Sequence, residues 1–408
     1  MKHKIVKGEM MKDIVVTGMG VLSTAGFTLD DYWHNLYDGK VTYGMIDEFK
    51  SNPNYRIKIG SKIKTSKWNT NVPEDILSTY GKAACYAVST TLKAIHHAKI
   101  DLNQVNNKRV GVVIGTTMGE IEVEEQITKF VCQNKSIDNR LYQQYQTFNI
   151  VKAVAEAVGA KGYMFAVPAA CAAGNYAVAI SKQLLEWDYA DMIITGGVDV
   201  FSKVAFAGFQ RLLSLATDFC RPFDKNRKGL VVGEGCGIVI LEKEKQRKNQ
   251  KVFGRIVGSG LSSNAYHMTA PHIHGEGELL AMKKAMMNTG LSLKDIDYIS
   301  AHGTGTKAND KIEAKVIKEM FKGHNLPPVS SIKSVLGHSM GAASTLELIA
   351  CLLMIQRRTI LPTMNYQSKD EDCDIDVVAN KPRKQNLKYV MSNSFAFGGQ
   401  TSSLVIGV

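Results

Sequence analysis

Short apolar runs rich in valine and isoleucine alternate along this chain with longer segments whose apolar residues recur at helical spacing. The short runs beside glycine indicate buried strands, and the longer segments indicate helices that bury one face. The predicted strands lie at 14–17, 111–115, 192–195, 237–241, 254–258, 298–300 and 403–408, and the predicted helices at 82–98, 174–187, 278–288 and 342–356. Such alternation implies a layered α/β fold.

The chain divides into a short extension and two larger parts. Residues 1–11 form the extension, because Met11 directly precedes the first predicted strand. The N-terminal part spans 12–251 and the C-terminal part 252–408, and the lysine-rich stretch 242–251 marks the seam between them. The possible translation starts are Met1, Met10 and Met11.

Each part contains a strand that runs into a loop of glycine and threonine. The loop is Gly115-Thr116-Thr117 in the first part and Gly303-Thr304-Gly305-Thr306 in the second. The echo suggests an internal duplication, although no short repeat is visible. The first strand is expected to break at Gly18-Met19-Gly20.

The chain is basic: lysine and arginine number 50 against 38 aspartates and glutamates, a net charge of +12. Such a surface attracts polyanions, namely nucleic acid, an anionic membrane or an acidic protein. There is no basic low-complexity tail, no zinc-finger spacing and no basic run interleaved with aromatic residues, so nucleic acid is not the expected partner. A protein whose basic charge is itself the function stays open as an alternative.

The seven cysteines are scattered and never form a Cys-x-x-Cys pair. No apolar segment follows the basic N-terminus, so we expect reduced thiols in the cytoplasm. The most apolar segment, 346–355, carries Glu347 and is shorter than the roughly 18 residues of a membrane helix. We therefore expect a buried helix there and no membrane association.

Cys171 lies among small residues, in Ala169-Ala170-Cys171-Ala172-Ala173, directly before a predicted helix. A thiol at a helix N-terminus is expected to have a lowered pKa and to favour the thiolate. Small neighbours let a substrate carbonyl approach, and N–H groups at the turn can hold its oxyanion. From the cysteine alone, a small buried side chain at an alanine-rich helix start is the simpler alternative.

Two histidines follow glycine-rich loops. His302 comes directly after a predicted strand, which suits a hydrogen-bond donor or an acid–base group aimed into a cleft. His338 stands where a loop gives way to a helix, and a helix N-terminus should keep its imidazole neutral. Lys333 and Glu347 flank His338, and an ordinary ion pair would explain them. His272 and His274 have no third ligand at fitting spacing, so no metal site is expected.

In order along 11–408, the motifs resemble those of β-ketoacyl-[acyl-carrier-protein] synthases, in particular the type II elongating, KAS II-like condensing enzymes and their polyketide relatives. The matching segments are Val15-Val16-Thr17-Gly18-Met19-Gly20, Ala169-Ala170-Cys171, Arg221-Pro222-Phe223-Asp224, Gly233-Glu234-Gly235, Ala265-Tyr266-His267-Met268-Thr269, His302-Gly303-Thr304-Gly305-Thr306, 333–338 and 393–399. A Cys-His-His set with a lysine five residues before the second histidine is far more specific than any one motif.

The resemblance implies the duplicated thiolase-like fold, a five-layered α/β/α/β/α core, usually as a dimer. It implies that Cys171 takes the acyl chain from a carrier protein and that His302 and His338 stabilise the enolate left when malonyl thioester loses carbon dioxide. No cofactor or metal is implied, since the substrates ride on the phosphopantetheine of the carrier protein. The resemblance also implies supporting roles. Lys333 would orient the histidines, supported by Glu347, Asp310 and Glu313, and the N–H groups of Cys171 and Phe397 would form the oxyanion hole, with Phe397 also as the gate of the acyl pocket. Thr304 and Thr306 would contact pantetheine, and Met118 would border the acyl pocket.

Decarboxylation generates a carbanion equivalent without a strong base when neutral donors stabilise the enolate oxygen. A thiolase instead deprotonates, typically with a second cysteine near its C-terminus. In this chain the closing loop holds Phe397, and Cys373 lies elsewhere in an acidic stretch. The expected reaction is therefore a decarboxylative Claisen condensation that extends a fatty-acid or polyketide chain by two carbons.

An acidic acyl carrier protein would complement the basic charge. The candidate docking strip is Lys58, Lys62, Lys64 and Lys67, and a solvated lysine face is the alternative. The expected assembly is a homodimer, or a heterodimer with a subunit like a chain-length factor. A non-catalytic partner subunit would lack the nucleophile, whereas Cys171 is present.

Some positions depart from the family's usual pattern. Ala169 stands where threonine is common, Asn264 replaces a frequent aspartate, and the closing loop reads Ala396-Phe397-Gly398-Gly399-Gln400-Thr401. None of them touches the Cys-His-His set. Together with Gly305 and Asn309, they favour as an alternative a ketosynthase subunit of a type II secondary-metabolite pathway over housekeeping fatty-acid synthesis.

Overall fold

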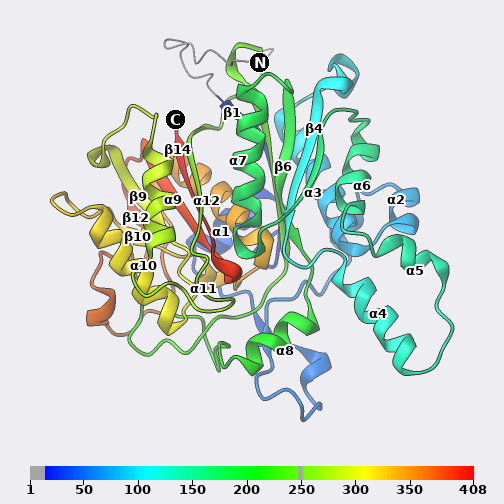
Figure 1. Ribbon diagram of the computed structural model, residues 1–408, viewed down its shortest axis with the longest axis horizontal. Helices are drawn as coiled ribbons and strands as arrows, with labels where there is room; N and C mark the ends of the chain where they lie inside the picture. Colours follow the sequence, from blue (N-terminus) through cyan, green and yellow to red (C-terminus); the bar gives the residue numbers. More distant parts are fainter. Residues whose placement is uncertain (1–13, 247–250) are drawn as a thin grey trace.

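The computed structural model describes residues 14–246 and 251–408 (Figure 1). The predicted extension 1–11 and part of the predicted seam lie outside these residues. Ten strands join in one sheet in the order β10-β9-β13-β14-β8-β1-β7-β6-β4-β5. Their bounds are β1 Ile14–Ser23, β4 Val110–Thr116, β5 Met164–Pro168, β6 Met192–Asp199, β7 Gly235–Lys243, β8 Gly254–Ser263, β9 Ile296–Ser300, β10 Val329–Ser330, β13 Tyr389–Phe395 and β14 Gln400–Gly407.

The sheet consists of two five-stranded halves with one topology. In each half the first three strands, β5-β4-β6 or β10-β9-β13, are parallel, and the next two, β7-β1 or β14-β8, are antiparallel. The halves meet where β1 pairs with β8, through Val15 with Arg255 and Val16 with Gly254. The similarity between the two Gly/Thr loops therefore has a structural basis, because β4 and β9 occupy equivalent positions in the two half-sheets.

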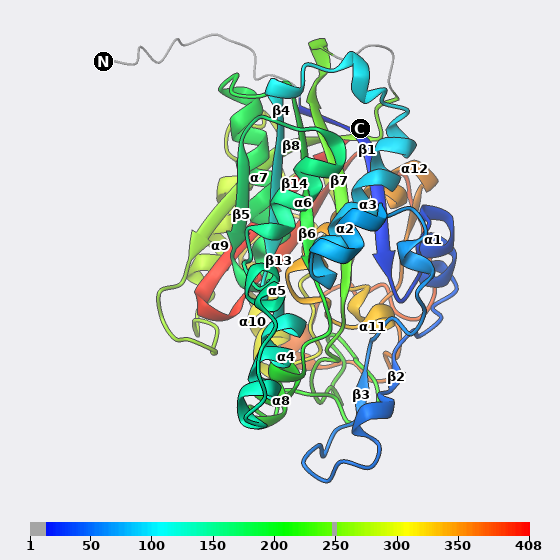
Figure 2. The same cartoon turned by 90° about the vertical axis from the view of Figure 1, so that its right-hand side faces the viewer.

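The helices form three layers around the two half-sheets, which follow one another across Figure 1, and Figure 2 views this stack from the side of α3 and α6. α3 and α6 cover the N-terminal half-sheet, and α9 and α10 lie on the outer side of the C-terminal half. α7 and α12 lie between the halves and contact strands of both. The predicted five-layered α/β/α/β/α core is confirmed. The helices are α1 Leu29–Tyr37, α2 Glu74–Thr79, α3 Lys82–Ala98, α4 Ile121–Cys132, α5 Asn139–Gln144, α6 Asn149–Val158, α7 Ala173–Glu186, α8 Lys203–Arg211, α9 Glu276–Met286, α10 Lys307–Met320, α11 Lys333–Leu336 and α12 Ala343–Arg357.

α12 is the most apolar helix of the core. Within the described residues, the segment Met340–Arg357 alone is long and apolar enough to cross a membrane, but 89% of it is buried inside the protein. Every residue from Ala343 to Ile355 is buried against the two half-sheets and α7. The apolar composition of α12 is thus explained by its place in the central helix layer, where all its faces are buried.

β1 differs from the sequence prediction. The strand does not break at Gly18-Met19-Gly20 but continues to Ser23, with a register shift against β7 between Val16 and Gly18. A Cβ at Gly18 would lie 2.5 Å from the carbonyl oxygen of Ala94, and one at Gly20 would lie 2.3 Å from that of Thr90. The glycines therefore let α3 approach the strand and do not end it.

Two small two-stranded sheets complete the chain, and the loops that matter for chemistry gather at one end of the large sheet. The two-stranded pieces are β2 Gly44–Met45 with β3 Ile59–Gly60, and β11 Thr359–Ile360 with β12 Arg383–Lys384. Cys171 follows β5, His302 follows β9, His338 follows β10 through α11, and Phe397 follows β13. Carboxyl ends of parallel strands in α/β sheets are where ligands commonly bind.

Candidate active site

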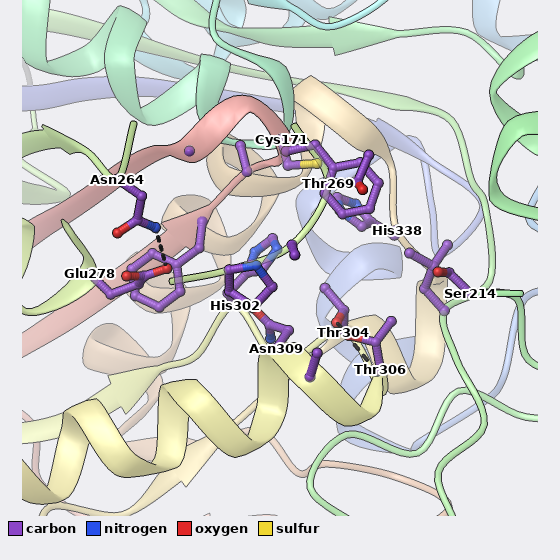
Figure 3. A pocket seen from close by; sticks show the side chains of 18 of the residues that line it. Cys171, Ser214, Asn264, Thr269, Glu278, His302, Thr304, Thr306, Asn309 and His338 are labelled. Carbon is purple, nitrogen blue, oxygen red and sulfur yellow. Dashed lines mark hydrogen bonds between the residues drawn. The ribbon is translucent and has the colours of Figure 1, made fainter. Parts of the chain in front are cut away.

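Three side chains that are far apart in sequence line one cavity. Cys171, His302 and His338 all border a space of about 130 Å³. Figure 3 shows them around its upper part. The centroids of the two imidazole rings lie 5.5 Å apart with the rings nearly perpendicular, at 82°. The structure thus brings together the sulfur and the two imidazoles expected to act together.

The backbone around Cys171 is a tight strand-to-helix turn. Ala170 has a φ of +45°, and Cys171 lies in the short 3-10 helix η5, Ala170–Ala172, directly before α7. Ser394 fixes the turn from β13, because its hydroxyl donates to the carbonyl oxygen of Cys171 at 3.0 Å. Only small side chains fit here, since a Cβ at Gly174 would lie 2.2 Å from the hydroxyl of Thr345.

The expected lowering of the Cys171 pKa is wrong for this structure. Burial raises the pKa of the thiol to about 12, because a buried thiolate loses its hydration. Three influences oppose burial: the Lys333 ammonium and the backbone N–H groups of Cys171 and Phe397. The helix N-terminus therefore does not outweigh the desolvation of a side chain that is only 6% exposed.

The N–H groups of Cys171 and Phe397 both interact with the sulfur, so two backbone donors lie close to the reacting atom. Phe397 begins η10, Phe397–Gly399, and the next two residues both have positive φ. Its ring is 37% exposed and lies 5.5 Å from the ring of Phe209, another residue of the cavity wall. The loop therefore offers an inward N–H and an aromatic ring at the margin of the cavity.

His338 has a defined hydrogen-bonding pattern. The N–H of Met340 donates to its Nδ1 at 3.2 Å, so the proton of the neutral ring lies on Nε2. Burial and the charge of Lys333 hold the pKa of His338 well below its usual range. The prediction of a neutral imidazole is confirmed, with burial as the leading cause.

His302 is held through its backbone. Its N–H donates to Glu313 Oε1 at 2.8 Å, and its carbonyl oxygen accepts from Lys333 Nζ at 2.8 Å. Burial, Lys333 and His338 together place the pKa of His302 well below its usual range. Its Nδ1 has no hydrogen-bond partner among the residues that the structure describes. The ring is therefore a neutral group at the cavity wall, with Nδ1 unpaired among the described residues.

Lys333 is one of the most buried charges of the protein, at 1% exposure. It forms an ion pair with Glu347 on α12, and it also donates to His302. Burial raises the pKa of Glu347 to about 7, and Lys333 opposes this increase. The ion pair expected from the sequence is present, but it also anchors the backbone of a cavity residue.

The loop after β9 is supported by two carboxylates of α10. Glu313 accepts from the N–H groups of His302 and Gly303, both at 2.8 Å. Asp310 accepts from the N–H groups of Thr304 and Gly305 at 3.1 and 3.2 Å. Thr304 and Thr306, whose hydroxyls are 2.9 Å apart, line the cavity below the imidazoles (Figure 3).

The sequence analysis missed Asp199, at the end of β6. Its buried carboxylate accepts from the hydroxyl of Thr116 and from the N–H groups of Thr117, Met118 and Gly341. It thereby ties the loop after β4 to the turn before α12. A carboxylate directly after the predicted strand 192–195 and its two glycines was the available signal.

Other predicted residues lie elsewhere. Met118 is not among the described residues that border the cavity, and it packs against the hydrophobic core that includes residues of α3 and β4.

In the strip of four lysines, Lys62 pairs with Glu48 at 2.5 Å and Lys64 with Asp47 at 3.1 Å, so part of the charge of the strip is neutralised locally. Among the described residues, no group of three or more histidines, cysteines or carboxylates could hold a metal ion.

A duplicated five-layered fold with a buried thiol and two neutral imidazoles at the same end of its half-sheets defines the condensing enzymes of the thiolase-like class. The family described as "Beta-ketoacyl synthase, N-terminal domain" matches residues 11–247, and "Beta-ketoacyl synthase, C-terminal domain" matches 253–367. The chain therefore belongs to the β-ketoacyl synthase family.

Individual relatives agree over nearly the full chain. Nodulation protein E of Rhizobium meliloti (strain 1021) is 32% identical over 401 residues, covering 97% of this chain and 99% of the relative. 3-oxoacyl-[acyl-carrier-protein] synthase 2 of Synechocystis is 34% identical over 406 residues, covering 96% and 97%. The protein is thus a KAS II-like 3-oxoacyl-[acyl-carrier-protein] synthase, an acyltransferase that condenses units in fatty-acid or polyketide elongation.

Solved structures show the same fold. The ishigamide ketosynthase/chain length factor superposes with a TM-score of 0.92 at 32% identity, covering 98% of this chain and 100% of that one. A type II PKS acyl-carrier protein in complex with its ketosynthase, bound to the hexaketide, contains a chain with a TM-score of 0.91 at 25% identity and the same coverage. These likenesses show that the fold is shared over nearly the whole chain.

Proposed function

We propose that Cys171, His302 and His338 carry out a decarboxylative Claisen condensation of a cysteine-bound acyl chain with a malonyl thioester. The observation that carries the proposal is their common cavity, with the backbone N–H groups of Cys171 and Phe397 at the sulfur. The two N–H groups would then serve the acyl group on Cys171, and the two imidazoles would serve the malonyl thioester. The product would be two carbons longer than the acyl substrate.

In the first step, the sulfur of Cys171 attacks the carbonyl carbon of an acyl thioester on a carrier protein. A carbon–sulfur bond forms to the enzyme, the bond to the pantetheine sulfur breaks, and the released thiol takes up the proton lost by Cys171. The N–H groups of Cys171 and Phe397 stabilise the oxyanion of the tetrahedral intermediate. Because both hydrogen-bond donors are in position before the thioester binds, little rearrangement of the protein is needed as the oxyanion forms.

In the second step, a malonyl thioester enters and loses carbon dioxide. The electron pair of the breaking carbon–carbon bond forms a thioester enolate, whose oxygen accepts hydrogen bonds from the neutral imidazoles of His302 and His338. The enolate carbon then attacks the acyl carbonyl, the bond to Cys171 breaks, and the departing thiolate takes up a proton from solvent. Lys333, with Glu347, holds the loop of His302 during this step.

Intact-mass measurement tests the assignment. Incubation with an acyl carrier protein thioester should raise the mass of the protein by one acyl group, and Cys171→Ala should abolish the increase. An unchanged wild-type mass with several acyl lengths would contradict the proposed nucleophile.

We further propose an acyl carrier protein as the partner that delivers both substrates. The net charge of +12 and the basic strip of Lys58, Lys62, Lys64 and Lys67 support an acidic partner, by charge complementarity. Binding of the carrier protein should weaken steeply with salt and with Lys58→Glu. Tighter salt-sensitive binding of DNA than of carrier protein would favour the polyanion alternative.

The proposed assembly is a dimer formed along β5, the edge strand of the N-terminal half. Tyr163, Phe165, Trp187 and Tyr189 are 42 to 65% exposed around it, which is a large aromatic surface for a free edge. A homodimer fits a fatty-acid role, and a heterodimer with a subunit like a chain-length factor fits a type II secondary-metabolite pathway. Light scattering of the protein alone and mixed with such a subunit distinguishes the two.

The proposed compartment is the cytoplasm, and the proposed division of the chain is the extension 1–11 with halves at 12–251 and 252–408. All seven cysteines lie within the described residues and are free thiols, which fits a reducing environment. The matched topology of the half-sheets supports the division.

A further inference from the structure

A second cavity lies apart from the catalytic one. Its volume is about 750 Å³, and among the described residues it shares no lining residue with the cavity that holds Cys171. Its walls come from β1, the segment before α1, the start of β8 and the C-terminal ends of α3 and α12; the helices and β1 lie together on the right of Figure 2. Ligand pockets typically measure about 300–1,000 Å³, so this one can hold a small molecule.

The second cavity lies where the two half-sheets separate. β8 pairs with β1 only at Val15 and Val16, whereas β1 continues beside β7. Phe253, just before β8, still donates its N–H to the carbonyl oxygen of Val16 at 2.8 Å and then lines the cavity. Further along β1, the N–H of Met19 donates to Nδ1 of His97 on α3 at 3.2 Å. A histidine side chain thus stands where a strand partner would, and the cavity opens beside this edge of β1.

The wall of the second cavity combines apolar side chains with positive charge. Lys93 Nζ lies 5.5 Å from the ring centroid of Phe27, and Lys251 Nζ lies 5.1 Å from that of Phe253. All four residues line the cavity, so both ammonium groups lie against rings of its wall. The apolar part of the wall includes Met19, Val21, Phe27, Leu92, Phe253 and Leu353.

The two ammonium groups are not neutralised by the protein. Asp30 is the one acidic residue among the described residues of the wall, and it pairs with Arg357 at 2.6 Å. Neither Lys93 nor Lys251 forms an ion pair within the part of the chain that the structure describes. Burial lowers the pKa of Lys93, and burial followed by the charge of Lys251 lowers that of His97. An anion in the cavity would supply the missing charge.

We propose that the second cavity binds an amphipathic anion, a molecule with one anionic head and an apolar body. The head lies against the ammonium of Lys93, and the body packs against the apolar wall. A small polar anion would leave that wall in contact with water, and an uncharged apolar molecule would leave the ammonium without a partner. Alkyl carboxylates and alkyl phosphates share the required chemistry.

Isothermal titration calorimetry with four ligands tests the proposal. Octanoate and octyl phosphate carry a chain and an anionic head, octanol carries the chain alone, and acetate carries the head without the chain. Each ligand is titrated into the wild type, Lys93→Gln and the matched control Lys99→Gln. Lys99 is exposed at the end of α3 and does not line the cavity.

Octanoate should bind the wild type with a Kd below about 1 mM, and acetate at least about a hundredfold more weakly, because six methylene groups are no longer buried. Lys93→Gln should weaken octanoate and octyl phosphate about tenfold and leave octanol unchanged, and Lys99→Gln should stay within about twofold of the wild type. Either order of the two anions supports the site, and the tighter one identifies the head group.

Three results would overturn the proposal. The first is octanoate binding that Lys93→Gln does not weaken, which would place the ligand elsewhere. The second is an equal loss for octanoate and octanol, which would remove the role of the charge. The third is no octanoate binding up to about 1 mM, which would leave Lys93 as a lysine that covers apolar surface and reaches water. Thermal unfolding of Lys93→Gln should match the wild type, because no ion pair of Lys93 is lost.

Discussion

The two halves of the molecule share one strand order and one set of strand directions, yet they contribute different chemistry to the same cavity. In the N-terminal half, the turn between β5 and α7 carries the thiol of Cys171. In the C-terminal half, the connection between β10 and α12 carries the imidazole of His338. Ala170 and Met340, in equivalent turns, both have positive φ. The comparison shows that a duplicated backbone can hold a nucleophile in one copy and a neutral hydrogen-bond donor in the other.

The loops after β4 and β9 differ in a second way. In the N-terminal half, Asp199 from a neighbouring strand holds the loop and also reaches Gly341 of the other half. In the C-terminal half, Asp310 and Glu313 of the following helix hold the loop that carries His302. The catalytic loop is thus supported locally, and the equivalent loop became a link between the halves.

The largest expected effect separates the two chemistries. Cys171→Ala should abolish acyl loading and still permit release of carbon dioxide from malonyl carrier protein. His302→Ala should permit loading and lower the release of carbon dioxide by about a thousandfold, because the enolate loses a neutral donor. Intact mass and carbon dioxide release measure the two activities. Loss of both activities in each variant would show that the halves do not act separately.

The buried pair that joins α11 to α12 should give the next largest effect. Lys333→Ala leaves Glu347 buried without its partner and should lower the free energy of unfolding by about 3–5 kcal/mol. Denaturant unfolding measures the loss. The double variant Lys333→Met with Glu347→Leu removes both charges and should recover most of the stability while activity stays low. Equal stability of the single variant and the wild type would contradict the role of the pair.

Asp199→Asn tests the link between the halves. An amide NH2 would face N–H donors in place of a carboxylate oxygen, so we expect a loss of about 2–3 kcal/mol. Asp75→Asn, at an exposed position on α2, is the matched control and should change stability by less than about 0.5 kcal/mol. Thermal and denaturant unfolding measure both variants. A loss no larger than that of the control would mean that the link is not energetically important.

The smallest expected effect concerns pH, and it distinguishes the halves again. The pKa values of His302 and His338 lie well below their usual range, so both rings stay neutral as the pH falls from 8 to 6. Imidazole protonation should therefore change carbon dioxide release by Cys171→Ala less than about twofold over this range, and any larger change should follow the Glu347 carboxyl, whose pKa is about 7. Alkylation of Cys171 by iodoacetamide, followed on its own peptide, should instead rise about tenfold per pH unit through pH 9, because its raised pKa keeps the thiol protonated. A fall in carbon dioxide release near pH 6.5 that persists when Glu347, whose pKa is about 7, is replaced by Gln would show that an imidazole titrates in the normal range.

Much of the layer structure followed from local pattern. The helix predicted at 82–98 is α3 without change, and the predicted strand 192–195 is the start of β6. The prediction failed at Gly18 and Gly20, because a glycine that ends a strand and a glycine that admits a neighbouring helix have the same local sequence. What separates them is α3, which lies many residues away.

Site residues could be predicted where the surrounding sequence motif is itself informative. They could not be predicted where the role of a residue depends on contacts with distant parts of the chain. Cys171 and His302 stand in recognisable surroundings of small residues and glycines. Asp199 follows a predicted strand and its glycines, but its importance comes from buried contacts with other elements, which that local signal does not reveal. The pKa of Cys171 was missed for the same reason, because the extent of desolvation is a property of the packed protein.

The position of α12 near the end of the chain has a consequence for synthesis. This helix fills the space between the half-sheets, and it is translated only after the whole N-terminal half has left the ribosome. Until then, α7 alone covers the inner face of that half, and the part over β7 and β6 that α12 contacts is left as an exposed apolar surface. Premature termination before residue 357 should therefore yield fragments that aggregate or need chaperones.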